Sequence, residues 1–112
     1  MAKYENVIVG DFDRVVEIIE EDMINSGVSM RLVDESNYTL GGTPIAVRIY
    51  DKYYARNGNR ASLSITMAGN DDTIYISAIG SGGGQGIFFN YSLGAENDMV
   101  AIVQESVDKI IF

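Results

Sequence analysis

The chain has 112 residues, of which 46% are hydrophobic and 21% are charged, and its formal net charge is −8. This composition supplies the core of one domain over residues 1–112, and the excess of acidic groups disfavours binding to nucleic acid. Because the sequence contains neither cysteine nor histidine, it excludes disulfides and thiol nucleophiles, and it lacks the commonest general base and metal ligand.

The N-terminal part of the chain predicts a strand followed by an amphipathic helix. The strand is expected over residues 3–9 and the helix from Phe12 to Asn25, with Asp11 as its N-cap and Gly27 as its stop. The apolar residues of this segment recur at helical spacing, and they are Phe12, Val15, Val16, Ile19 and Met23, widened by Ile18 and Ile24. The opposite face of the helix is acidic, with Glu17, Glu20, Glu21 and Asp22.

Four later segments have the alternation or the composition of strands. They cover residues 28–32, 45–54, 61–67 and 73–79. The polar stretch Asp34–Gly42 is expected to be a turn or a frayed strand end. Asn57-Gly58 is a strong hairpin signal, and residues 69–72 are expected to form the next turn.

The C-terminal part predicts one more strand, over residues 87–91, and a second helix that opens at Gly94-Ala95-Glu96. Short turns between consecutive strands require antiparallel neighbours. We therefore predict an α+β fold, in which two helices pack on one face of an antiparallel five- to six-stranded sheet in the order β-α-β-β-β-β-β-α. The residues expected to be buried together are Leu63, Ile65, Val15, Ile19, Val103 and Val107.

The alternation also predicts which side chains lie on the sheet face away from the helices. If Leu63 and Ile65 face the helices, their neighbours Ser64 and Thr66 face outward. The adjoining strands are expected to add Arg48, Tyr50, Lys52, Tyr54 and Tyr75. Tyrosine is enriched at interfaces, so a homodimer is expected, with the candidate interface residues Tyr50, Tyr54 and Tyr75. An ordinary solvated sheet face is the alternative, because tyrosine, serine and threonine are favoured in strands.

Residues 80–86, Gly-Ser-Gly-Gly-Gly-Gln-Gly, are the most unusual feature of the sequence. They do not match the dinucleotide-binding pattern, because Gln85 stands where its last glycine is required, and no P-loop lysine follows. A bulge or a close backbone approach explains such glycines. The alternative is a site for a small anionic ligand, built from backbone amides and arginines, with the candidate residues Arg48, Arg56, Arg60, Gly82, Gly83, Gly84 and Gln85.

Three short motifs occur together in this chain: Asn59-Arg60-Ala61-Ser62-Leu63, the segment from Gly80 to Phe89, and Gly94-Ala95-Glu96. In these motifs and in its length the chain resembles a small uncharacterised bacterial family of unknown function, associated with Firmicutes. The resemblance covers nearly the whole chain. It implies a bacterial, cytoplasmic, single-domain protein, and it implies no functional residue, because that family carries no assigned activity.

The sequence as a whole favours a non-catalytic interaction or small-ligand-binding module that self-associates. No spacing of its tyrosines, lysines or acids singles out a catalytic pair, so no catalytic residue, metal or cofactor is predicted. The N-terminus has no apolar signal region and no run has the length of a membrane span, so a cytoplasmic protein is expected. The alternative function is a binding protein or enzyme for a small anionic ligand that uses the glycine segment and nearby arginines.

Overall fold

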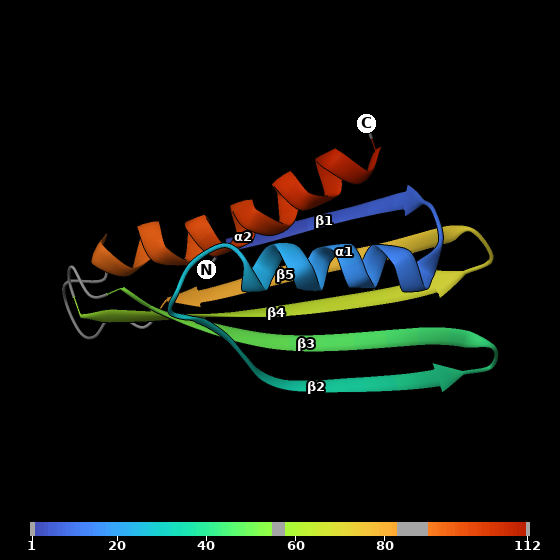
Figure 1. Ribbon diagram of the computed structural model, residues 1–112, viewed down its shortest axis with the longest axis horizontal. Coiled ribbons are helices and arrows are strands. Elements are labelled where there is room, and N and C mark those ends of the chain that lie inside the picture. Colours follow the sequence, from blue (N-terminus) through green and yellow to red (C-terminus); the bar gives the residue numbers. More distant parts are fainter. Residues whose placement is uncertain (1, 55–57, 83–89, 112) are drawn as a thin grey trace.

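The computed structural model describes residues 2–54, 58–82 and 90–111, in which five strands form one sheet and two helices lie on it (Figure 1). In chain order the elements are β1 (Ala2–Val9), α1 (Phe12–Ile24), β2 (Met30–Leu40), β3 (Thr43–Tyr54), β4 (Asn59–Asn70), β5 (Thr73–Gly82) and α2 (Asn90–Ile111). The strands follow the order β1-β5-β4-β3-β2 across the sheet, and each neighbouring pair is antiparallel. The predicted α+β class with an antiparallel sheet is confirmed.

Two tight turns determine which of the long strands pair with each other. Gly41 and Gly42, between β2 and β3, have φ angles of +56° and +83°. Two-residue hairpin loops favour this left-handed backbone, which glycine adopts without a steric penalty. Asp71, between β4 and β5, has a φ of +59° and starts the second such turn. These turns place β2 next to β3 and β4 next to β5. Strand β1 pairs with β5, the last strand in the sequence, and all the other strands and α1 lie between these two in the chain.

Strand β2 is longer than the sequence predicted, and it begins later. The prediction placed a strand over residues 28–32 and a turn or frayed end from Asp34 to Gly42, whereas β2 runs from Met30 to Leu40. It pairs with β3 along this length, with a register shift between Leu32 and Asp34. Because β2 is an edge strand and exposed at every residue after Met30, its sequence lacks the apolar alternation by which a half-buried strand is recognised.

The second helix starts before the predicted position. It begins at Asn90 and not at Gly94, so Asn90 and Tyr91, which were assigned to a last strand, are helical. The rest of that predicted strand, residues 87–89, lies outside the described residues. Glycine at position 94 suggested a helix boundary on grounds of propensity, but a single glycine is tolerated inside a helix at a cost of about 1 kcal/mol.

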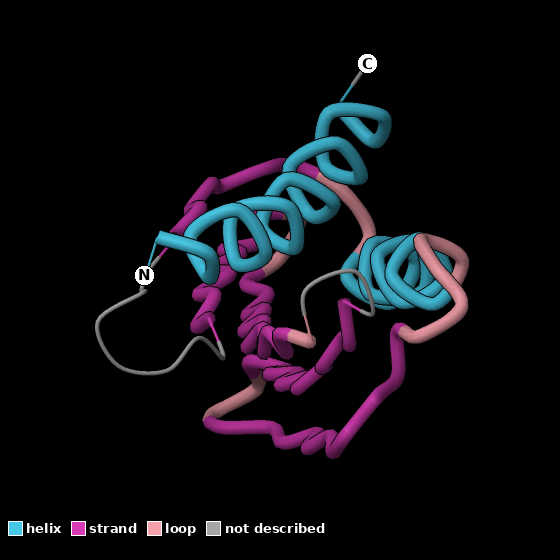
Figure 2. The backbone as a smooth tube through the Cα atoms, turned by 90° about the vertical axis from the view of Figure 1, so that its left-hand side faces the viewer, coloured by secondary structure: helices cyan, strands magenta, loops and turns pink. Residues whose placement is uncertain are grey.

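Both helices lie on the same face of the sheet. α2 packs on β1, β5 and β4, and α1 lies beside α2, over β4 and next to β2. The view along the sheet in Figure 2 shows the two helices side by side, with the strands on one side of them only. The predicted packing of two helices on one face is therefore confirmed, and none of the described elements covers the opposite face of the sheet.

Local sequence explains where α1 begins and which side it buries. Asp11 has an extended backbone, and its carboxylate accepts a 3.1 Å hydrogen bond from the Arg14 amide, as an N-cap does. The residues that α1 buries are Val15, Val16, Ile19 and Met23, which are members of the predicted stripe. They join the buried β4 and β5 side chains and Val103 and Val107 of α2 in one hydrophobic core. All six residues expected to be buried together belong to it.

Candidate functional site on the open face of the sheet

The register of β3 against β4 decides which side chains of β3 face the helices. Leu63 and Ile65 of β4 are fully buried under the helices, and their partners on β3 are Tyr50 and Arg48. Directly opposed residues of an antiparallel pair point to the same side of the sheet. The predicted open-face positions of Arg48, Tyr50, Lys52 and Tyr54 are therefore wrong, and these residues belong to the helix side.

The side of the sheet away from the helices is called the outer face below. Its members follow from the register, and they are Lys3, Glu5, Val7 and Val9 of β1; Arg31, Asp34, Ser36, Tyr38 and Leu40 of β2; Thr43, Ile45, Val47, Ile49, Asp51 and Tyr53 of β3; Arg60, Ser62, Ser64, Thr66, Ala68 and Asn70 of β4; and Thr73, Tyr75, Ser77, Ile79 and Ser81 of β5. The predicted outward positions of Ser64, Thr66 and Tyr75 are confirmed.

The outer face is rich in apolar side chains. Among the described residues, twelve large hydrophobic side chains are exposed, and seven of them are on this face: Val7, Val9, Tyr38, Leu40, Tyr53, Tyr75 and Ile79. Between them run Ile45, Val47 and Ile49 of β3, which are half-buried by their neighbours alone. Contiguous exposed apolar surface of this kind marks interaction sites in soluble proteins.

The charged groups of the outer face are paired with one another. Arg31 donates two hydrogen bonds to the Asp51 carboxylate, from Nε to Oδ1 at 2.8 Å and from Nη2 to Oδ2 at 3.1 Å. Arg60 Nη1 lies 3.5 Å from the same Asp51 carboxylate, and the Arg60 guanidinium is 5.6 Å from the centre of the Tyr53 ring. The two arginines hold the pKa of Asp51 below its usual range, with Arg31 as the larger cause.

A second polar group lies on the β1 side of the outer face. The Tyr75 hydroxyl donates a 2.6 Å hydrogen bond to Glu5 Oε2, and Lys3 Nζ lies 3.8 Å from the other Glu5 oxygen. The hydrogen bond lowers the pKa of Glu5 and raises the pKa of Tyr75. Each of these groups therefore keeps a partner if a second surface excludes water from this face.

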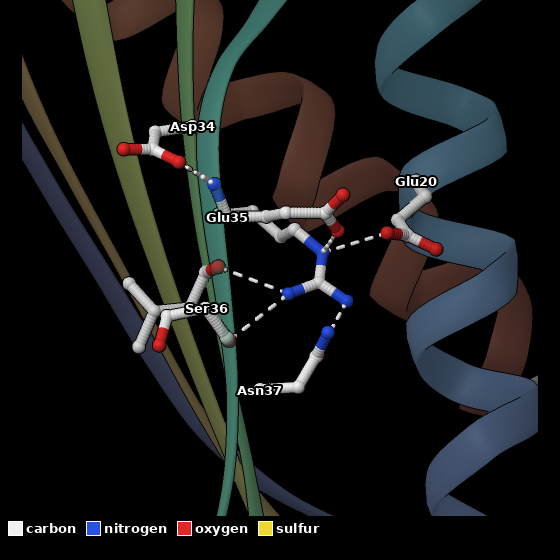
Figure 3. Close-up of polar contacts among 7 residues, drawn as sticks. Glu20, Asp34, Glu35, Ser36 and Asn37 are labelled. Carbon is white, nitrogen blue, oxygen red and sulfur yellow. Dashed lines mark hydrogen bonds and ion pairs between the residues drawn. The ribbon is translucent and has the colours of Figure 1, made fainter.

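Arg48 is buried on the helix side, where protein acceptors surround its guanidinium. Figure 3 shows Glu20 of α1 on one side of it, with Glu35, Ser36 and Asn37 of β2 on the other. Arg48 Nε donates to Glu20 Oε2 at 2.6 Å and lies 3.4 Å from Glu35 Oε1. Its Nη1 donates to the Ser36 and Val47 carbonyls, and its Nη2 donates to Asn37 Oδ1. This arginine ties α1 to β2 and has little capacity left for an anion.

Of the other tyrosines predicted at an interface, Tyr50 is only 1% exposed and Tyr54 packs against the core. Burial raises the pKa of Tyr50 to about 12, and the nearby Glu20 carboxylate adds to the increase. Burial also raises the pKa of Tyr54. Of the three candidate interface tyrosines, the outer face therefore holds Tyr75 alone.

Of the candidate anion-binding residues that the structure describes, Gly82 and Arg60 lie near each other and Arg48 lies apart from them. Gly82 pairs with Ala61, so the end of β5 and the start of β4, next to Arg60, lie at the same end of the sheet. Arg48 lies in the middle of β3, on the opposite face from Arg60. Arg56, Gly83, Gly84 and Gln85 lie outside the described residues.

Within residues 2–54, 58–82 and 90–111, no three acidic side chains converge in the way that a metal ion would require. No helix there combines the length and the apolar character needed to cross a membrane.

The outer-face residues that the sequence analysis missed are Ile45, Val47 and Ile49. Their apolar character suggested the core, and the charge of Arg48 suggested solvent. The spacing of the sequence did indicate the correct faces. A two-residue turn at Asn57-Gly58 would pair even-numbered residues of β3 with odd-numbered residues of β4, such as Leu63 and Ile65, which were expected to face the helices. The observed register, with Tyr54 opposite Asn59, has the same parity.

Comparison with known proteins agrees with the resemblance read from the motifs. No curated protein matches the chain. The model of a family described as a family of unknown function, DUF6054, matches residues 1–111. The chain therefore belongs to the DUF6054 family.

Proposed function

We propose that this protein is a non-catalytic interaction module that self-associates as a homodimer through its outer face. In keeping with the bacterial family that its motifs resemble, we place it in the bacterial cytoplasm. The observation that carries the proposal is the strip of Ile45, Val47 and Ile49 in the middle of an uncovered sheet, surrounded by further exposed apolar side chains. Covering such a strip removes apolar surface from water, which is the main driving force of protein association.

The size of the outer face suits a dimer. Its five strands have 8 to 12 residues. With a rise of about 3.3 Å per residue and a strand spacing of about 4.8 Å, the sheet covers roughly 800 Å². A stable interface of standard size buries about 800 Å² on each partner. One copy of this face is therefore large enough for such an interface.

The charge of the outer face also favours a second copy of the same chain. It carries three acidic residues, Glu5, Asp34 and Asp51, and three basic residues, Lys3, Arg31 and Arg60. Its formal charge is therefore zero, while the whole chain has −8. Two copies that meet through this face keep their acidic helices apart, so like-charge repulsion is smallest in this orientation.

Two sheets that pack in this way form a sandwich, with about 10 Å between the sheets and strands inclined by about 30°. The apolar side chains of β3 would lie at its centre. The ion pairs that Arg31 and Lys3 form would lie toward the rim, where interfaces are usually polar.

The molar mass in solution tests this proposal, measured by light scattering across a range of concentrations. We expect about twice the 12.2 kDa of one chain for the wild type. Val47→Glu places a charge at the centre of the strip and is expected to return the mass to that of one chain. Val28→Glu is the matched control, because Val28 is fully exposed and lies outside the outer face, and it should stay dimeric.

A wild type that remains at 12.2 kDa at high micromolar concentration would contradict self-association. Equal masses for the folded Val47→Glu variant and for the wild type would place the interface elsewhere. Far-ultraviolet circular dichroism shows whether each variant is folded.

A further inference from the structure

Matching side chains lie on the two sides of β4, the central strand of the outer face. Three rows of side chains run across the sheet, each with one residue from every strand. In the order β1, β5, β4, β3 and β2, the rows are Val7, Tyr75, Ala68, Ile45 and Tyr38; Glu5, Ser77, Thr66, Val47 and Ser36; and Lys3, Ile79, Ser64, Ile49 and Asp34. The first row is apolar throughout, and the third has a lysine at one edge of the sheet and an aspartate at the other.

A two-fold axis parallel to β4 makes use of this match. When two outer faces meet through such an axis, each row meets itself in reverse order, so β4 lies on β4, β5 on β3 and β1 on β2 of the second copy. Tyr75 then meets Ile45 of the second copy, and Ile79 meets Ile49. The β4 positions of the three rows carry only short side chains, which let the two central strands approach closely, and they are Ser64, Thr66 and Ala68.

An axis across the strands matches the rows less well. It would reverse the strand direction of the second copy, so that Val47 meets Ile49 and Ile45 meets Asp51. The apolar first row would then cover the ion pair of Asp51 with Arg31, and taking charged groups out of water in this way is costly. The parallel axis avoids that cost, because Asp51 meets the polar position of β5 in its own row.

A hollow of about 130 Å³ beside Asp34 indicates which side chain of the second copy enters the outer face. Asp34, Ser36, Val47 and Ile49 line this hollow, together with Glu35. The Asp34 carboxylate accepts a 2.8 Å hydrogen bond from the Glu35 amide, and it forms no ion pair with any described residue. The hollow therefore has an apolar wall and a carboxylate without a cation. Lysine suits such a place, because it buries its alkyl stem on apolar surface and keeps its ammonium at the rim.

Lys3 is the lysine that the parallel axis brings to this hollow. Its side chain is 58% exposed, and its Nζ lies 3.8 Å from Glu5 Oε1, so the contact within its own chain is long and easily exchanged. Lys3 and Asp34 lie on the two edge strands of the sheet, four strand spacings or roughly 19 Å apart. An ion pair between them can therefore form only between two chains.

We infer that the second copy binds with the two-fold axis along β4, and that Lys3 of each copy enters the Asp34 hollow of the other. The inference rests on the proposed dimer and adds its orientation and its specific contacts. The two ammonium–carboxylate contacts lie at opposite edges of the sandwich, and they leave the apolar rows to meet between them. The Arg60 side chains of both copies lie at the same end of the axis, where each keeps its own Asp51 at 3.5 Å.

Native mass spectrometry at low ionic strength tests this orientation with two full-length variants mixed in equal amounts, one of them isotope-labelled. Lys3→Glu and Asp34→Lys each replace two attractive contacts with two repulsive ones, so each variant alone should dissociate about 10-fold more readily than the wild type. In a mixed dimer both contacts again join opposite charges. About nine-tenths of the dimers should therefore be mixed, compared with about half for random pairing.

Lys3→Glu mixed with Glu5→Lys is the matched control, because it carries the same charges as the first mixture. Glu5 meets Ser36 of the second copy, so about half of these dimers should be mixed. Random pairing in the first mixture would overturn the inference, and an excess of mixed dimers in the control would place the axis across the strands instead.

Isotope-filtered NOEs between Ile79 of one copy and Ile49 of the other are the second measurement, since only the parallel axis brings these two side chains together. A dimeric wild type without them would overturn the orientation but leave the proposed dimer in place. A wild type with the 12.2 kDa mass of one chain would contradict both. The two proposals therefore fail in distinguishable ways.

Discussion

Arg48 and Glu20 lie 28 positions apart in the sequence, and Arg48 Nε is 2.6 Å from Glu20 Oε2. The Arg48 side chain is 6% exposed and that of Glu20 is 35% exposed. This contact joins α1 to the middle of β3. It also places a cation beside the acidic C-terminal half of α1, where the helix has no basic residue of its own to complement its dipole.

Replacing Arg48 with methionine is expected to destabilise the fold by about 2–4 kcal/mol, measured by urea unfolding. The substitution keeps the volume but leaves the Glu20 and Glu35 carboxylates close together without their cation, and carbonyl oxygens lose their donor. In a double-mutant cycle, Arg48→Met and Glu20→Gln should show a coupling above about 1 kcal/mol.

The exposed pair Arg14 and Glu17, with a 3.0 Å contact on the surface of α1, is the control for that cycle. Its coupling should be about 0.5 kcal/mol or less, as for exposed pairs on one helix. Equal couplings for the two pairs would show that the Arg48 contact is no more than a surface ion pair.

Gly69 makes room for the Phe12 ring at the start of α1. A Cβ atom at position 69 would lie 2.8 Å from Phe12 Cδ1. We expect Gly69→Ala to destabilise the wild type by about 1–3 kcal/mol, the usual range for overpacking. In a Phe12→Ala background the same substitution should cost less, because the ring atoms are gone and only the Cβ atom of residue 12, at 3.3 Å, still limits the space.

Thermal and urea unfolding of the four proteins measure this difference in cost. A Gly69→Ala substitution that costs the same with and without the Phe12 ring would show that the ring does not limit the space at position 69.

Tyr50 makes the stability depend on pH in the alkaline range. Its pKa in the folded protein is about 12, above the usual tyrosine value of about 10. The unfolded state therefore loses this proton first, so the contribution of the neutral phenol is complete below pH about 10 and is lost as the pH rises toward about 12. Tyr50→Phe lacks this contribution, so its stability should fall less steeply than that of the wild type over this interval.

Urea midpoints across this interval provide the measurement, and Tyr38→Phe, at an exposed position of β2, is the control for the other alkaline titrations. Parallel curves for wild type and Tyr50→Phe would contradict the raised pKa.

The sequence predicted an element correctly where burial of one side gave its apolar residues a regular spacing. Leu63, Ile65 and Met67 of β4 alternate with polar residues, and the stripe of α1 follows the helical spacing, so these elements and the helix-covered sheet were predicted correctly. Strand β2 has no such period, because it is exposed on both faces at the edge of the sheet. The length of β2 depends on its backbone hydrogen bonds to β3, and these cannot be predicted from the composition of β2 alone.

The candidate site was predicted less well, because both faces of β3 carry apolar and polar side chains. Average polarity favoured Ile49 as a core residue and Arg48 as a surface residue, whereas the register reverses them. A buried arginine is stable only where acceptors surround it, and those acceptors come from α1 and β2. Tertiary contacts of this kind leave no local sequence pattern. A two-residue turn at Asn57-Gly58 would nevertheless have paired Arg48 with an odd-numbered residue of β4, and so would have placed it on the helix side.

Isotope-filtered NOE spectroscopy on a mixture of labelled and unlabelled chains tests most directly whether the outer face joins two copies. The account predicts intermolecular NOEs from the methyl groups of Ile45, Val47 and Ile49, and from the ring of Tyr75. These NOEs should disappear in Val47→Glu and persist in Val28→Glu. Intermolecular NOEs that arise from α1 or α2 instead, or a wild type that shows none at millimolar concentration, would contradict the account.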